Sequence, residues 1–147
     1  MSRVRSTRST SDGAPPDCDP HEYEYEWIHP ELSGDDPGAR GYHAACASED
    51  GLRLFVFGGI ARRQSIAALE VIELSTGRVE LLATTGPTPS PRFGCSLVAY
   101  GGRLWVVGGG NGCDLARSGH DLADVLTLDL ATLEWARVET TNRPHSP

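Results

Sequence analysis

Hydrophobic and polar residues alternate along most of the chain after its first third, and this alternation predicts β-strands. Two short segments, Leu52–Phe57 and Gly102–Val107, are rich in aliphatic and aromatic residues, and a pair of glycines follows each. A period of two residues with branched and aromatic side chains is typical of strands that bury one or both faces. No window shows the period of an amphipathic helix. We therefore expect an all-β protein.

Further strands are predicted on both sides of these two segments. Glycine-containing turns, of the kind that tight hairpins need, connect each segment to a preceding strand, and a polar loop leads to two following strands. The preceding strands are His43–Ser48 and Cys95–Tyr100, and the following strands are Ala68–Leu74, Arg78–Leu82, Asp124–Leu130 and Glu134–Glu139. The chain therefore predicts two antiparallel units of four strands each.

The two units repeat the same features at nearly constant spacing. Arg40 and Arg92 are 52 positions apart, and the pair Gly58-Gly59 precedes the pair Gly108-Gly109 by 50 positions. Beyond the glycines the offset becomes 56, because the loop of the second unit is six residues longer. Four strands per repeat and a period of about 50 residues are typical of β-propeller blades.

The repeat divides the chain into four segments. Residues 1–21 hold too few large apolar side chains to offset the entropy of ordering, so we expect a disordered tail. Residues 22–36 match, in register, an outer strand with Trp27 and a linker from a neighbouring blade. The complete repeats are residues 37–91 and residues 92–147, and the second stops where the Arg of a third repeat would follow. We expect an incomplete propeller, and favour missing chain over completion by self-association through exposed blade faces.

These features resemble the Kelch-repeat family. Its pattern has an Arg before a strand that carries His or Ser, a Gly-Gly pair after the second strand, an aliphatic third strand between acidic residues, and a Trp in the fourth. The sequence departs from this pattern at Ala68, Val79 and Cys95, and we expect each departure to weaken local packing or a turn contact without changing the blade. The resemblance implies a Kelch-type β-propeller segment of two four-stranded antiparallel blades plus one N-terminal outer strand. The matching residues are Arg40, His43, Gly58, Gly59, Arg92, Ser96, Gly108, Gly109, Asp124, Asp129 and Trp135.

The loops after the two glycine pairs are the candidate binding sites. Propeller loops from successive blades gather at one face, and loops on a rigid scaffold commonly carry recognition residues. Forked Arg donors in these loops suit the carboxylates of an acidic peptide, although ordinary solvated charges would look the same. The candidate partner-binding residues are Arg62, Arg63, Gln64, Asp114, Arg117 and His120.

The resemblance implies a protein-protein interaction module that binds a partner protein or peptide. Kelch proteins joined to an F-box or BTB domain recognise substrates for ubiquitin ligases, so the resemblance also implies this role in a longer parent protein. The alternative is a fragment of a metal-dependent Kelch-propeller enzyme, similar to galactose oxidase or to the specifier proteins of glucosinolate breakdown.

The residues themselves give little support for catalysis, and the acidic residues of the repeats fall on alternating positions that we expect to face solvent. The glycine-rich run Gly108–Gly112 follows a strand without opening a helix, so it does not match a phosphate-binding loop. His120 and Asp121 could pair, but no nucleophile is placed beside them to complete a triad. His43 is interpreted as a core residue of the repeat rather than a general base. We expect a protein that is not an enzyme and holds no cofactor or metal ion.

The distribution of charged residues and the spacing of the cysteines restrict the classes of partner and site further. The net charge of −7 arises mostly from Asp12–Asp36, which contains nine acidic residues and no Arg or Lys. The absence of a basic stripe argues against nucleic acid, and the absence of an apolar stretch of ~20 residues argues against a membrane partner. Cys46 and Cys95 are interpreted as small buried hydrophobic residues, since no C-x-x-C spacing occurs. We expect a cytoplasmic or nuclear protein.

Overall fold

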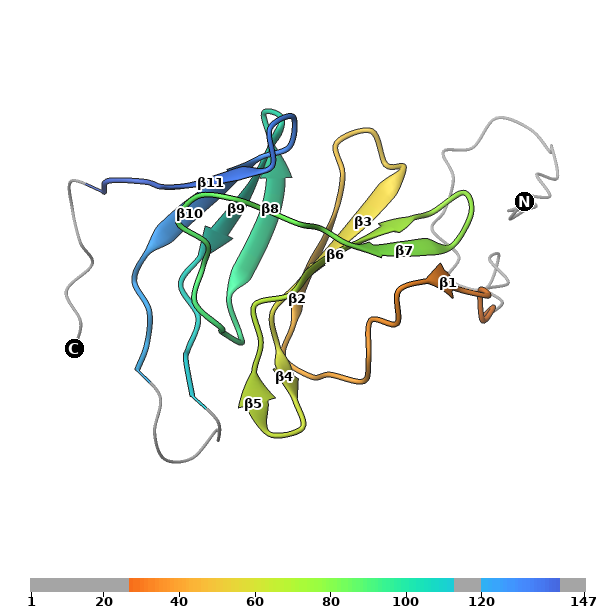
Figure 1. The fold of residues 1–147 in the computed structure, drawn as a ribbon, viewed down its shortest axis with the longest axis horizontal. Coiled ribbons are helices and arrows are strands. Elements are labelled where there is room, and N and C mark those ends of the chain that lie inside the picture. Colours follow the sequence, from red (N-terminus) through yellow and green to blue (C-terminus); the bar gives the residue numbers. More distant parts are fainter. Residues whose placement is uncertain (1–26, 113–119, 141–147) are drawn as a thin grey trace, which may run out of the picture. The chain divides into compact units, whose positions relative to one another are not determined.

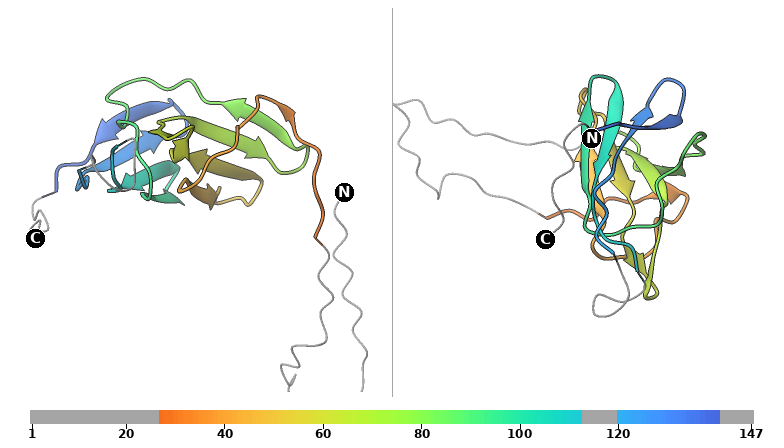
Figure 2. Two further views of the ribbon diagram at one scale, coloured as in Figure 1. Left: turned by 90° about the horizontal axis from the view of Figure 1, so that it is seen from below. Right: turned by 90° about the vertical axis from the view of Figure 1, so that its left-hand side faces the viewer.

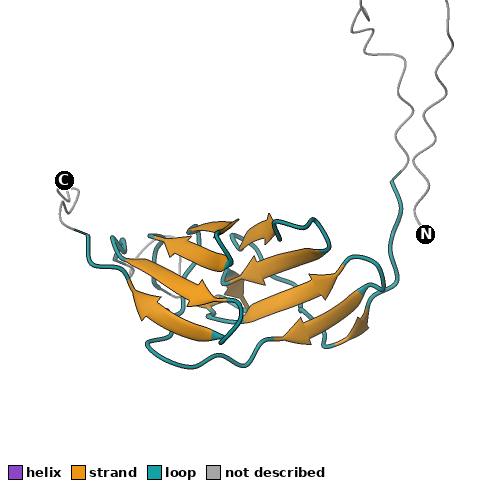
Figure 3. Cartoon of the chain, turned by 90° about the horizontal axis from the view of Figure 1, so that it is seen from above, coloured by secondary structure: helices purple, strands orange, loops and turns teal. Residues whose placement is uncertain are grey.

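The computed structural model describes residues 27–112 and 120–140 of the chain. By contacts, residues Leu32–Pro147 form one compact unit, and all the strands lie in it. Strands joined by loops and turns make up this part of the chain (Figure 3). The predicted tail, residues 22–26, Asp114 and Arg117 lie outside the described residues.

The first blade is a sheet in which four consecutive antiparallel strands lie side by side. They are β2 (Ala44–Ala47), β3 (Arg53–Phe57), β6 (Leu69–Glu73) and β7 (Arg78–Leu81), so the chain crosses the sheet from one edge towards the other (Figure 1). The register pairs Phe57 with Ala44 on one side and with Leu69 on the other. This arrangement confirms the predicted four-stranded unit.

The second blade repeats the first strand for strand. It consists of β8 (Ser96–Tyr100), β9 (Arg103–Val107), β10 (Val125–Asp129) and β11 (Glu134–Arg137), again antiparallel and in chain order. Backbone hydrogen bonds outside the strands are repeated as well. The N–H of Gly58 donates to the C=O of Ala68 at 3.0 Å, and the N–H of Gly108 donates to the C=O of Asp124 at the same distance. Structurally equivalent residues of the two blades are therefore separated by the offsets that the sequence predicts.

A short segment before each repeat also joins the outer edge of its blade. Strand β1 (Ser33–Gly34) runs parallel to β7, and in the second blade Thr85 forms a parallel bridge with Glu134 of β11. Each of these segments carries a glycine with positive φ, Gly34 or Gly86, at which a Cβ atom would clash with the carbonyl oxygen of the outer strand. Each blade therefore has a further glycine-dependent edge contact, a two-residue strand in the first blade and a single bridge in the second, that the alternation pattern did not predict.

The N-terminal strand at the sheet edge is β1, and its position differs from the expectation centred on Trp27. Trp27 and Ile28 lie outside any strand, and Trp27 is 95% exposed. An isolated extended segment cannot form a strand without a neighbouring backbone to bond, and β1 finds that neighbour in β7. The short range of β1 was missed because it has no apolar alternation.

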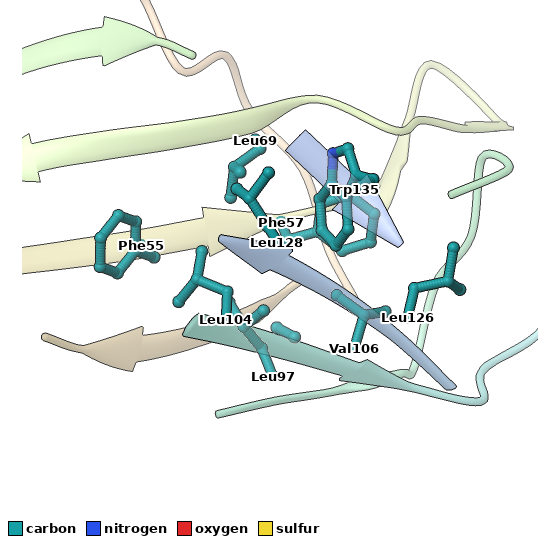
Figure 4. Close-up of a cluster of buried hydrophobic side chains, with 10 residues drawn as sticks. Phe55, Phe57, Leu69, Leu97, Leu104, Val106, Leu126, Leu128 and Trp135 are labelled. Carbon is teal, nitrogen blue, oxygen red and sulfur yellow. The ribbon is translucent and has the colours of Figure 1, made fainter. Parts of the chain in front are cut away.

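The hydrophobic core lies between the two blades (Figure 4). Phe57 of the first blade and Trp135 of the second are 0% and 2% exposed, and their ring centroids are 6.0 Å apart. Aromatic pairs at this separation add to the free energy gained from burial. The remaining buried members are Ala44, Phe55, Leu69, Leu97, Leu104, Val106, Leu126 and Leu128. Because both blades contribute, neither blade completes its core alone.

Candidate functional site

The loop after the first glycine pair and the described ends of the loop after the second lie together at one end of the blades, as predicted. The first loop contains a hairpin of two short strands, β4 (Ile60–Ala61) and β5 (Gln64–Ser65), beside the start of the second loop (Figures 1 and 2). The Ser65 hydroxyl donates a hydrogen bond of 2.8 Å to the carbonyl oxygen of Gly112. We call this end the loop face; it comprises the β4–β5 hairpin, Tyr42, Phe93, Gly110–Gly112 and His120–Asp121.

The candidate residues Arg62 and Arg63 form the two-residue turn at the tip of the hairpin. Both are exposed, and both have left-handed backbone angles, with φ of 49° and 67°. A two-residue turn with two positive φ angles matches the twist of the flanking strands, and it ordinarily holds Asn-Gly. Gln64 follows in β5 and is exposed too. The structure therefore presents two guanidinium groups on a turn that neither Arg favours intrinsically.

Tyr42 adds an exposed aromatic ring beside the hairpin. It is 60% exposed, and its ring lies edge-on to Phe93 of the second repeat, with centroids 6.4 Å apart. Its φ of 57° matches the φ of 62° at Gly94, the equivalent position 52 residues later. The N–H of Gly94 donates to the C=O of Tyr42 at 2.9 Å, which ties the two repeats together at the loop face. Neither Tyr42 nor Phe93 was among the predicted binding residues, because their exposure depends on how the blades pack.

Hydrogen bonds between His120 and Asn111 join the two described ends of the second loop. Its N–H donates to the side-chain oxygen of Asn111 at 2.8 Å, and its C=O accepts from the N–H of Asn111 at 3.2 Å. The side chains of His120 and Asp121 are exposed. The structure thus places His120, Arg62, Arg63 and Gln64 on one face, while the two other predicted residues of the second loop fall outside the described residues.

Two equivalent ion pairs hold the glycine corners from which these loops start. Arg92 is 1% exposed, and its guanidinium donates to both carboxylate oxygens of Asp124, at 2.7 and 3.0 Å, and to the C=O of Gly108 at 3.0 Å. In the first blade Arg40 donates to both carboxylate oxygens of Glu70. Two-point Arg–carboxylate contacts fix orientation as well as distance. The repeat arginines are therefore structural, and they set the direction in which each loop leaves its blade.

The acidic partners correct two inferences from the sequence. We expected the acidic residues of the repeats to lie on solvent-facing positions, but Glu70 is 4% exposed and Asp124 is largely buried beside Arg92. Ala68 occupies the position of Asp124 in the first repeat, and we expected a weakened contact there. Glu70 lies two residues later, and its longer side chain reaches Arg40 instead. The hydrogen bonds from Arg92 hold the pKa of Asp124 below its ordinary value, against the opposing effect of desolvation.

The interpretation of His43 as a core residue is wrong. The side chain is exposed, because the residue lies just before β2, on the side of the loop face. A Cβ atom at Gly59 would lie 3.0 Å from the Cβ of His43, so the stem of the histidine lies close against this glycine. Cys46 and Cys95 are half-buried and pack against the core, and burial raises the pKa of both thiols.

Two further observations concern the described residues only. No group of three His, Cys, Asp or Glu side chains among them is arranged to hold a metal ion. None of these residues forms a helix that could cross a membrane.

Comparison with known proteins gives matches to Kelch-repeat proteins. The family described as the KLHDC2/KLHL20/DRC7 Kelch-repeats domain matches residues 18–147. The bovine Rab9 effector protein with kelch motifs is 36% identical over 97 residues, which cover 64% of this chain and 25% of the relative. The Rho GTPase-activating protein gacHH of Dictyostelium discoideum is 31% identical over 118 residues, which cover 72% of this chain and 8% of the relative.

A third relative is subunit 7 of the dynein regulatory complex of Chlamydomonas reinhardtii, which is 32% identical over 85 residues. These residues cover 57% of this chain and 7% of the relative. The chain therefore spans a quarter or less of the length of each of these relatives. With the repeated strands, the glycine corners and the family match over most of its length, the chain belongs to the Kelch-repeat family.

Proposed function

We propose that the chain is a protein-interaction scaffold that binds its partner at the loop face. The supporting observation is that loops from both repeats meet there, joined by the hydrogen bond between Ser65 and Gly112. The blades beneath are held by a common core and by buried ion pairs, so the loops project from a rigid base. Such an arrangement suits recognition of another protein. Family membership and the names of the relatives, which include a Rab9 effector, favour the same class of function over an enzyme.

The chemistry of the loop face favours an acidic peptide as the ligand. Two guanidinium groups at the hairpin tip can bind carboxylates through paired hydrogen bonds, and the exposed ring of Tyr42 lies on the same face for an apolar contact. Recognition of a substrate for a ubiquitin ligase is a narrower form of this proposal, and it requires a partner domain that delivers the ligase.

The test is binding of a fluorescent peptide of alternating Glu and Gly, measured by fluorescence anisotropy against a Lys-Gly peptide of equal length. Replacing Arg62 and Arg63 by Ala should weaken binding of the acidic peptide at least tenfold, since the loss of even one hydrogen bond to a charged group costs about 1.5 kcal/mol. Arg78→Ala is the matched control, because Arg78 is exposed but lies in β7 outside the loop face. Equal binding by the double variant and the unaltered chain would contradict the proposal.

A further inference from the structure

The two outer faces of the pair of blades are related by the repeat itself. In the existing interface, Phe57 and Cys46 of the first blade face the second blade. Their equivalents in the second blade, by the offsets of 50 and 52 positions, are Val107 and Val98. These two residues are 44% and 51% exposed, and Tyr100 beside them is 71% exposed. The second blade thus presents, uncovered, the face that the first blade buries in the core.

The first blade presents the complementary face. Leu97 and Leu104 of the second blade are buried in the existing interface, and their equivalents are Ala45 and Leu54. Ala45 is exposed and Leu54 is half-buried. The two outer faces therefore correspond to the two halves of one interface, and they lie at opposite ends of the pair of blades.

Backbone hydrogen bonds make the same match more specific. At the existing interface the N–H of Arg92 donates to the C=O of Ile66 at 3.1 Å, and its C=O accepts from the N–H of Gly59 at 2.8 Å. The equivalent acceptor and donor in the second blade are the Leu122 C=O and the Gly109 N–H. Within the described part of the chain, neither of these two groups forms a hydrogen bond.

The first blade offers the groups that would satisfy them. The residue equivalent to Arg92 is Arg40, and neither its backbone N–H nor its C=O forms a hydrogen bond among the described residues. The third contact at the existing interface is the hydrogen bond from the Gly94 N–H to the Tyr42 C=O. Because Tyr42 and Gly94 are equivalent positions, the matching contact between the outer faces would join the Tyr42 N–H to the Gly94 C=O. Neither of these two groups forms a hydrogen bond among the described residues. Six backbone groups are thus matched in pairs between the two outer faces. A docked surface would take these groups out of water, and buried backbone groups almost always need a partner, so the matched pairs favour a cover that supplies them.

We propose that the second blade of one copy of this chain docks onto the first blade of another copy, head to tail, repeating the interface between its own two blades. The Arg40 backbone of the incoming copy bonds to Leu122 and Gly109, and its Tyr42 N–H bonds to Gly94. Because the two contact surfaces differ, the contact is heterologous and extends to further copies until a ring closes. We propose a second copy as the occupant, in place of the missing chain favoured from the repeat count, because a copy carries the complementary strand positions and backbone groups.

The test uses the full chain and two variants at exposed positions in edge strands. Val98→Asp places a charge on the outer face of the second blade, and Ala45→Asp places one on the outer face of the first. The mass of each protein is measured by light scattering after size exclusion, with circular dichroism as the check on folding. The unaltered chain should form species larger than a dimer, and each variant alone should be monomeric.

Mixing the two variants is the decisive measurement. Val98→Asp keeps the outer face of the first blade and Ala45→Asp keeps that of the second, so the mixture should form a one-to-one dimer of twice the monomer mass. Leu74→Asp, in an exposed turn, is the control and should associate like the unaltered chain. If Val98→Asp does not fold, Tyr100→Asp takes its place.

Three results would overturn the proposal. The first is an unaltered chain that stays monomeric at every concentration, which would mean that something other than a second copy covers these faces. The second is a mixture of the variants that remains monomeric. The third is association of either variant alone, which would indicate contact between like faces.

Discussion

At the scale of single residues, the pair of Arg92 and Asp124 shows how a repeat motif becomes a structural anchor. The guanidinium is buried, so an unpaired positive charge there would be costly, and the carboxylate supplies two hydrogen bonds. The same guanidinium holds the carbonyl of Gly108, where the second loop begins. The anchor therefore links a buried charge to the direction of a surface loop.

Replacing Asp124 by Asn should make stability less dependent on pH in the acidic range. The pKa of Asp124 is lower in the folded than in the unfolded chain, mainly because Arg92 donates to its carboxylate. Its contribution to stability is thus fully present above the unfolded pKa of about 3.9 and is lost as the pH falls through the folded pKa. At neutral pH the variant should be less stable by about 2 kcal/mol.

The measurement is urea unfolding of both proteins from pH 7 downward. The difference between their free energies of unfolding should shrink below about pH 4, where Asp124 takes up a proton in the unfolded chain while it stays ionised in the folded one. A constant difference across this range would contradict the assignment of the pair as charged.

Gly86→Ala tests the close contact at the outer edge of the second blade. A Cβ atom there would lie 2.5 Å from the carbonyl oxygen of Trp135, and the φ of Gly86 is 78°. The substitution should cost about 2 to 3 kcal/mol, measured by thermal or urea unfolding. Gly101→Ala is the control, because its φ is 63° but no atom lies within 4 Å of its Cβ position. It should cost only about 1 kcal/mol, and equal losses would argue against the steric account.

At the scale of elements, the β4–β5 hairpin sets the geometry of the loop face. Its two paired positions, Ile60 with Ser65 and Ala61 with Gln64, place Arg62 and Arg63 at the turn between the two strands. Left-handed angles at residues other than glycine cost stability, and such residues are often retained at functional sites. The hairpin therefore combines a local backbone cost with two exposed cations, which supports the proposal that it takes part in binding.

Exchanging Arg62 and Arg63 for Asn and Gly should separate stability from binding. Asn-Gly favours this turn, so the variant should be more stable by about 1 kcal/mol in urea unfolding. The same variant should lose affinity for the acidic peptide, because the guanidinium groups are gone. The variant with both residues replaced by Ala keeps the strained angles and also lacks the charges, so it should lose affinity without gaining stability. A gain in affinity with Asn-Gly would contradict the proposal that Arg62 and Arg63 bind the acidic peptide.

At the scale of the whole molecule, the core between the blades makes the two repeats interdependent. Phe55, Phe57 and Leu69 on one side meet Leu104, Leu128 and Trp135 on the other. Repeats that share a core fold together, because each supplies part of the buried surface of its neighbour. The loop face depends on this coupling, since its residues come from both repeats.

Phe57→Ala should lower the stability of both blades in one transition. Removing a fully buried aromatic side chain costs about 3 to 4 kcal/mol, and the cavity would adjoin Trp135. The change should appear equally in circular dichroism and in tryptophan fluorescence. Leu52→Ala, at a side chain that is 56% exposed, is the control and should change stability by less than about 0.5 kcal/mol. Two separate transitions would indicate blades that fold independently.

The predicted elements and the observed ones agree where the apolar pattern is strong. All eight blade strands could be predicted, because alternation and the glycine pairs are properties of the local sequence. The β4–β5 hairpin and β1 could not, because two-residue strands carry no periodic signal. The hairpin tip was placed among the candidate binding residues from charge and loop position alone, without its turn geometry.

The amino-acid sequence by itself determined the repeat, the strand order within each blade and the family, since these follow from spacing and from the alternation of side chains. Only the tertiary structure decided which face of each blade is covered, that Glu70 replaces the acidic residue missing at Ala68, and that Tyr42 and Phe93 lie with the hairpin on one face. These features depend on contacts between residues distant in the chain, and no local pattern encodes them. The inference about the two outer faces also depends on the tertiary structure, because the residues equivalent to theirs are seen buried in the interface between the blades.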